Sequence, residues 1–91
     1  MAKFVFDFSV TRQFTDEDEE VIALFKSDND AWAFIQGLRT LDEQNDLVTL
    51  TGDEAFEKEG IAVSSEIEDG GGFVTVFGPN EGTVTYRLRQ Y

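Results

Sequence analysis

The hydrophobic residues of this chain change their spacing twice, and that change constrains the fold more than any other feature. From Lys3 to Val10 an apolar side chain recurs at every second position, which is the period of a half-buried strand. After Ser27 the spacing becomes helical, and from Leu47 onward it returns to short strand-like runs. We therefore expect an α+β domain in which one main α-helix packs on one face of an antiparallel sheet of five or six strands.

The predicted helix has a clear start. The Ser27 side chain can cap free backbone amides, and the acids that follow it meet the positive end of the helix dipole. The helix is expected to end at about Gln44, and Gly37 interrupts it at a cost of about 1 kcal/mol relative to alanine. Its apolar face is expected to contain Ala31, Phe34, Ile35, Leu38 and Leu41.

The remaining segments are short, and their patterns predict mainly strands. Glu20 to Lys26 fits both a strand and a helix, and we favour the strand. Further strands are predicted at 47–51, 61–67, 73–77 and 83–91, with a short helical turn within 52–60. The glycines at 70–72 and the turn residues at 79–82 predict tight connections. Because no repeat or linker interrupts the sequence, we expect residues 1–91 to form one domain.

The large net negative charge of the chain limits the kinds of molecule that it can bind. Nineteen Asp and Glu residues oppose seven Lys and Arg, which gives a net charge of −12 in 91 residues. Fourteen of the acids lie within residues 13–59, including the unbroken run from Asp16 to Glu20. Solubility of a small domain needs a net charge of magnitude only about 2 to 8. Since added like charges destabilise the compact state, the acidity indicates either a cationic partner or adaptation to high salt.

Catalytic chemistry is poorly represented. The chain contains no His and no Cys, so the common general bases, nucleophiles and metal ligands are missing, and we predict no enzyme and no cofactor. The acids near positions 16 and 28 lack the Gly and Glu of a calcium-binding loop, so no metal site is predicted. The triple glycine leads into a strand and follows acids, which favours a hairpin over a phosphate-binding loop.

The sequence also shows no membrane-spanning or export signal. The longest apolar run, Val21 to Phe25, is far shorter than the roughly 20 residues of a membrane helix. The first ten residues lack a basic start followed by a small-residue cleavage site. We therefore expect no membrane partner and a cytoplasmic location, which would be the host cytoplasm for a viral protein.

Several acids break local rules of folding. Asp42, Glu43 and Asp46 lie at the expected C-terminus of the helix, where each opposes the dipole by roughly 0.3–1 kcal/mol. Trp32 lies to one side of the apolar face, so it is either an exposed anchor or a cover over the edge of the core. The predicted partner-binding residues are Asp16, Glu17, Asp18, Glu19, Glu20, Asp28, Trp32, Asp42, Glu43 and Asp46.

These features favour a small inhibitor that presents carboxylates where a basic nucleic-acid-binding protein expects phosphates. In size and acidity alone the chain resembles phage-encoded inhibitors of host defence or repair, such as anti-CRISPR proteins and uracil-DNA glycosylase inhibitors. Arg87 and Arg89 cannot offset the net charge, so direct nucleic-acid binding is not expected. The alternative is a non-inhibitory interaction or structural subunit, for example a homodimer paired through a strand edge, whose acidity reflects solubility or salt adaptation.

Overall fold

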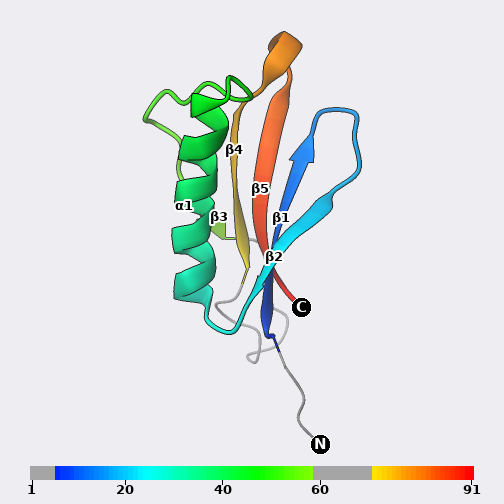
Figure 1. The fold of residues 1–91 in the computed structure, drawn as a ribbon, viewed down its shortest axis with the longest axis vertical. Coiled ribbons are helices and arrows are strands. Elements are labelled where there is room, and N and C mark those ends of the chain that lie inside the picture. Colours follow the sequence, from blue (N-terminus) through cyan, green and yellow to red (C-terminus); the bar gives the residue numbers. More distant parts are fainter. Residues whose placement is uncertain (1–5, 59–70) are drawn as a thin grey trace, which may run out of the picture.

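The computed structural model describes residues 6–58 and 71–91, in which a long helix packs on one face of an antiparallel sheet (Figure 1). The predicted α+β class is therefore confirmed. In chain order the elements are β1 (Phe8–Phe14), β2 (Glu20–Phe25), α1 (Asp28–Gln44), β3 (Glu57–Lys58), β4 (Gly72–Phe77), the 3-10 turn η2 (Pro79–Glu81) and β5 (Thr83–Gln90).

The sheet places the first and last strands of the chain beside each other. Its order is β2-β1-β5-β4-β3, and every neighbouring pair is antiparallel. In the pairing of β1 with β5, Phe8 lies opposite Gln90 and Phe14 opposite Val84. Four strands are six to eight residues long, whereas β3 has only two. The described sheet thus has four full strands and a short edge segment, in place of five or six full strands.

The core lies between α1 and the sheet. Burial alternates along β5, and the side chains of Val84, Tyr86 and Leu88 are fully buried. Each fully buried aliphatic side chain contributes about 1.5–3 kcal/mol relative to an exposed one. The buried apolar residues are Val10, Ala31, Ile35, Val48, Val74, Val76, Val84, Tyr86 and Leu88.

The helix begins as predicted but does not present the predicted face along its whole length. The Ser27 hydroxyl accepts a hydrogen bond from the Asp30 amide at 3.3 Å, which confirms the cap. Leu41, expected in the core, is 52% exposed, while Asp42 is buried. The reason is a partner on the sheet: Arg12 reaches Asp42 from β1, so this last part of the buried face is polar.

Two strand predictions need correction. The first strand begins at Phe8 and continues to Phe14, beyond the predicted end at Val10, because β5 pairs with it over that whole length. The predicted strand at 47–51 is wrong, since only Thr49 forms a bridge, to Phe77.

Other local predictions fared differently. The strand reading of Glu20 to Lys26 is confirmed by β2, and the strands at 73–77 and 83–91 are confirmed by β4 and β5. No helical turn forms within 52–58, where Gly52 has a φ of 92°, outside the helical region, and residues 53–56 have no regular secondary structure before β3. Residues 59–60 of that predicted turn lie outside the described residues. The predicted strand at 61–67 lies outside the described residues, as do residues 1–5 of the first predicted strand. Over the described ranges, no helix combines the length and apolar content needed to cross a membrane.

Candidate functional site at the acidic end

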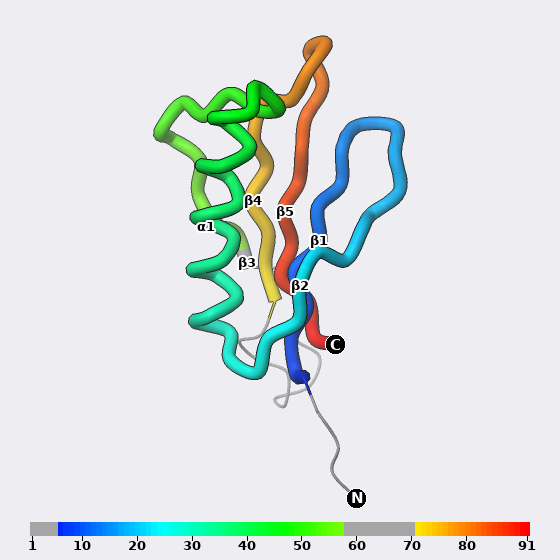
Figure 2. The backbone as a smooth tube through the Cα atoms, in the orientation of Figure 1, coloured from blue at the N-terminus to red at the C-terminus, as the bar shows by residue number. Residues whose placement is uncertain are grey.

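Three segments that are distant in sequence meet at one end of the domain. They are the β1–β2 turn, the segment that follows α1, and the turn around η2, all at the upper end in Figure 1. Figure 2 shows the segment after α1 crossing this end toward β4, where Thr49 bridges Phe77. We call residues 15–18, 43–53 and 78–82 the acidic end.

The acidic end carries negative charge without a compensating base. Its sequence contains seven acids and no Lys or Arg, which gives it a formal charge of −7. The acids come from all three segments, so folding concentrates charge that the sequence distributes over more than sixty positions. These acids are Asp16, Glu17, Asp18, Glu43, Asp46, Asp53 and Glu81.

Hydrogen bonds hold two of the segments together. The Thr15 hydroxyl accepts from the Thr83 amide at 2.7 Å and donates to the Thr83 carbonyl at 2.9 Å. A Cβ added at Gly82 would stand 2.7 Å from the Thr15 Oγ1, so only glycine permits this approach. Between the two turns lies a hollow of about 210 Å³, lined in part by Asp16 and Asn80. The β1–β2 turn is therefore fixed against the η2 turn.

In the turns of the acidic end, acidic residues occupy positions whose backbone conformation glycine adopts at lower energy. Asp16, Asp46 and Glu81 have φ angles of 67°, 63° and 63°, in the left-handed region. For a residue with a Cβ this conformation is unfavourable by roughly 1–2 kcal/mol, although Asp tolerates it better than most. Turn geometry therefore does not explain these carboxylates.

Five of the predicted site residues belong to the acidic end. Asp16, Glu17, Asp18, Glu43 and Asp46 are all exposed there. Glu20, the last of the acidic run, is exposed at the start of β2, next to this end. These are the sequence-predicted residues that the structure brings together.

Glu19 is engaged in an ion pair. Its carboxylate accepts hydrogen bonds from Arg89 Nε at 2.7 Å and from the Thr11 hydroxyl. The hydrogen bond from Arg89 holds the pKa of Glu19 below its usual value, against a smaller opposing effect of burial. Its charge is therefore compensated within the domain, unlike the charges of the acidic end.

Asp42 is a core residue, so its prediction as a surface residue is wrong. Its carboxylate accepts two hydrogen bonds from Arg12 Nη1, at 2.9 and 2.8 Å, and one from the Tyr86 hydroxyl at 2.7 Å. The Asp42 side chain is only 3% exposed. Burial, reinforced by the hydrogen bond to Asp42, raises the pKa of Tyr86 above its ordinary value. Asp42 thus joins α1 to β1 and β5 and is not presented to a partner.

Trp32 and Asp28 also lie away from the acidic end. The Trp32 ring packs edge-on against Phe56, with centroids 4.5 Å apart. It lies so close to β4 that a Cβ added at Gly72 would stand 2.8 Å from Trp32 Cζ2. Of the two alternatives for Trp32, the structure therefore favours a cover over the core edge. Asp28 is half-buried at the start of α1, at the opposite end of the helix (Figure 1).

Sequence reasoning overlooked three residues of this region. Asp53 and Glu81 add two carboxylates to the acidic end. Phe77, at the end of β4 beside it, is 59% exposed. Alternation along the strand could have revealed Phe77, because Val74 and Val76 face the core and odd positions point the other way.

The described residues of the acidic end contribute negative charge and a hollow between two turns. Within residues 6–58 and 71–91, no group of three or more acidic side chains is arranged to hold a metal ion. Comparison with known proteins adds no function, since no family model, curated protein or solved structure matches this chain.

Proposed function

We propose that this protein is a small inhibitor that occupies the nucleic-acid-binding surface of a basic protein by presenting its acidic end in place of phosphates. One observation carries the proposal: seven acids from three separate segments gather at one end, without a Lys or Arg among them. Proteins that bind nucleic acid use Lys and Arg to neutralise phosphates, so a rigid surface of the same sign competes for those side chains.

The distribution of the arginines supports the same proposal. Three arginines form ion pairs with acids that do not belong to the acidic end. The pairs are Arg12 with Asp42, Arg39 with Glu54 and Arg89 with Glu19. These three arginines thus compensate acids that support the fold, and none of the three pairs includes an acid of the acidic end. A negative field at that end would accelerate encounter with a cationic surface.

The alternative function, a subunit paired through a strand edge, is less well supported. Strand β2 forms one edge of the described sheet, and its Val21 is 56% exposed. However, a bulge interrupts the pairing of β2 with β1 between Val10 and Thr11. Bulges twist an edge and discourage pairing with another chain.

The inhibitor would act in the cytoplasm, and in the host cytoplasm if the protein is viral.

Affinity capture tests the proposal. The immobilised protein is exposed to a nuclease-treated lysate at low salt, about 0.05 M, and the retained proteins are identified before and after a step to about 0.5 M. We expect a discrete basic nucleic-acid-binding protein that is released by salt and displaced by added DNA or RNA. Retention of no such protein, or of a partner that DNA and RNA leave bound, contradicts the proposal.

A matched pair of double variants locates the surface. Asp16→Asn with Asp18→Asn removes two charges from the acidic end, whereas Asp7→Asn with Glu57→Gln removes two exposed charges elsewhere. The first pair is expected to weaken partner binding roughly tenfold at low salt and to reduce its salt dependence. The second pair is expected to have little effect. Equal weakening by both pairs would mean that the partner responds to net charge and not to this surface.

A further inference from the structure

We infer that a hollow beside Phe77 receives an arginine side chain of the basic partner. This inference rests on the proposed function and names the group that the site would recognise. The hollow has a volume of about 270 Å³ and lies between β4 and the loop 51–54. Its lining includes Thr51, Asp53 and Glu54 from the loop and Thr75, Val76 and Phe77 from β4.

The hollow arises from a gap in strand pairing. On the outer edge of β4, Gly72 and Phe73 pair with β3, and Phe77 bridges Thr49. Among the described residues, positions 74–76 have no paired strand on this edge, because the chain leaves the edge through the loop 51–54. Within the described structure, the edge of β4 is therefore open at these three positions.

Hydrogen bonds make the loop wall rigid. The Glu54 carboxylate accepts from the Thr51 amide at 2.6 Å, from the Thr51 hydroxyl at 2.8 Å and from the Gly52 amide at 3.2 Å. It also accepts from Arg39 of α1 at 3.2 Å. A wall that is already ordered lowers the entropy lost on binding.

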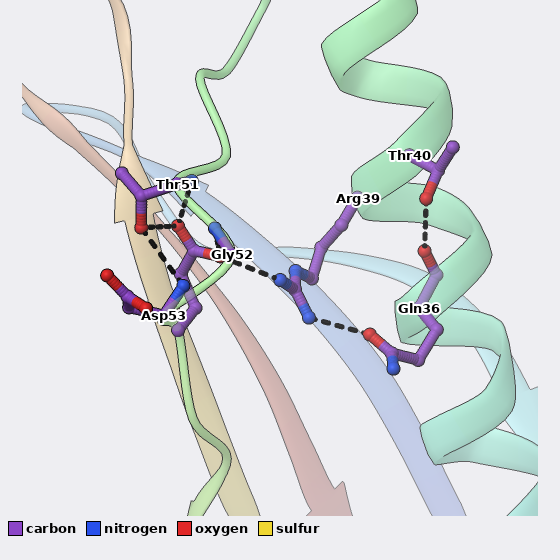
Figure 3. Close-up of polar contacts among 7 residues, drawn as sticks. Gln36, Arg39, Thr40, Thr51, Gly52 and Asp53 are labelled. Atoms are coloured by element: carbon purple, nitrogen blue, oxygen red, sulfur yellow. Dashed lines mark hydrogen bonds and ion pairs between the residues drawn. The ribbon is translucent and has the colours of Figure 1, made fainter.

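Asp53 and Phe77 supply the two properties that an arginine needs. The Asp53 carboxylate makes no hydrogen bond or ion pair with a described residue, and Figure 3 shows it pointing away from Arg39. The Phe77 ring is 59% exposed. A planar guanidinium can lie over an aromatic face while it donates two hydrogen bonds to a carboxylate, which an ammonium cannot do.

The protein uses the same contact internally. Within the described residues, an Arg guanidinium lies over a Phe ring in three places, at 5.1, 5.6 and 5.4 Å from the ring centroid. The pairs are Arg12 with Phe14, Arg39 with Phe56 and Arg87 with Phe73. An Arg–Phe contact is therefore compatible with the surroundings of this sheet.

Charge selects a cationic occupant over an apolar one. The hollow adjoins the acidic end, which has a formal charge of −7, and an apolar side chain would leave the Asp53 carboxylate without a partner. Exposed ion pairs alone contribute little to affinity, whereas partly buried aromatic pockets carry much of the binding energy of an interface. The hollow would thus supply the anchor that the acidic end lacks.

Peptide titration tests the inference. The full chain, labelled with ¹⁵N, is titrated with a capped hexa-arginine peptide and with the matched hexalysine peptide at low salt. We expect the arginine peptide to bind more tightly and to shift the amide signals of Thr51, Asp53, Thr75 and Phe77 most. Phe77→Ala and Asp53→Asn should each weaken binding of the arginine peptide about tenfold, and Phe77→Leu should remove the preference for arginine.

Control variants separate this inference from the proposed function. Tyr91→Ala removes an exposed aromatic ring and Asp7→Asn removes an exposed carboxylate, both far from the hollow, and neither should alter binding. If Phe77 and Asp53 contact one guanidinium, the double variant loses less than the sum of the single losses. Suppose that both peptides bind equally, and that Phe77→Ala leaves this binding unchanged while the Asp16 and Asp18 double variant weakens it. This result would contradict the inference that the hollow binds arginine, but it would agree with the proposed function of the acidic end. If neither peptide binds, the result contradicts the inference about the hollow and also counts against the proposed function of the acidic end.

Discussion

At the scale of single residues, charged groups in this domain serve two separate purposes. Asp42 lies almost fully buried between Arg12 and the Tyr86 hydroxyl. A buried ion pair adds little net stability compared with apolar packing, but removing one partner is costly. We interpret this network as a device for orientation, since only one rotation of α1 brings Asp42 to Arg12. Asp16 and Glu43, by contrast, are exposed and support no comparable contact.

Glu54 leads to a prediction about pH. Hydrogen bonds from the Thr51 backbone, with smaller contributions from its hydroxyl and from Gly52, lower the pKa of Glu54 from 4.5 to about 2. Because the folded pKa lies below the unfolded one, its contribution is complete above pH 4.5 and is lost as the pH falls toward 2. We expect Glu54→Gln to lower the free energy of unfolding by about 1–3 kcal/mol at neutral pH.

Urea unfolding at a series of pH values checks this prediction. The difference between Glu54→Gln and the parent protein should shrink steadily as the pH falls below 4.5, since the carboxylate is then protonated in the unfolded chain but stays ionised in the folded protein until the pH approaches 2. Asp53→Asn, one position away, is the matched control and should change stability little, because the Asp53 carboxylate contacts no described partner. A difference that stays constant with pH would mean that Glu54 acts through shape and not through charge.

At the scale of elements, packing partners decide what each glycine does. Gly37 lies in the exposed middle of α1, and a Cβ added there meets nothing within 4 Å. Gly72 opens β4, where a Cβ would stand 2.7 Å from the Glu57 carbonyl oxygen and 2.8 Å from the Trp32 ring. The same residue type is therefore a weakness in the helix and a requirement in the strand.

Two alanine substitutions should accordingly have opposite effects. Gly37→Ala is expected to raise the free energy of unfolding by about 0.5–1 kcal/mol, because alanine loses less backbone entropy in a helix. Gly72→Ala is expected to lower it by about 1–3 kcal/mol, because Trp32 or β3 must shift. Thermal and urea unfolding of the two variants measure both effects. A loss of stability in Gly37→Ala would show that the helix needs glycine at this position for another reason.

At the scale of the whole molecule, negative charge is concentrated at one end of the described structure. The acidic end holds a formal charge of −7, more than half of the net −12 of the chain. Three arginines, Arg12, Arg39 and Arg89, form ion pairs with acids outside the acidic end, namely Asp42, Glu54 and Glu19. This concentration of charge gives the described structure one strongly negative end, and the cationic partner proposed above depends on that end.

Salt should therefore stabilise the isolated protein. Raising sodium chloride from about 0.02 M to about 0.5 M screens the repulsion among exposed carboxylates, and we expect the free energy of unfolding to rise by about 1 kcal/mol. The Asp16→Asn and Asp18→Asn double variant should gain less, and the Asp7→Asn and Glu57→Gln control should gain nearly as much as the parent. Urea unfolding at each salt concentration measures the gain. A fall in stability with salt would show that attraction within ion pairs outweighs the repulsion.

The sequence by itself determined the features that depend on neighbours along the chain. The Ser27 cap, the extent of α1 and the strands β4 and β5 follow from local periodicity and turn residues, and all were predicted. The segment of β2 fitted both a strand and a helix, and its pairing with β1 decided between them. The excess of acids was also visible, and with it the class of partner that we propose. These properties need no knowledge of contacts between distant segments.

Only the tertiary structure decided which acids share a surface. Asp42 and Glu43 are adjacent in sequence, yet Asp42 is buried against Arg12 while Glu43 is exposed, because Arg12 faces the helix from a strand thirty positions away. Long-range contacts also place Asp53 at the acidic end, beside β4, and pair Glu19 with Arg89, so that Glu19 does not belong to that end. The charge of a residue is set by its identity, but its partner is set by long-range strand pairing, which local patterns do not encode.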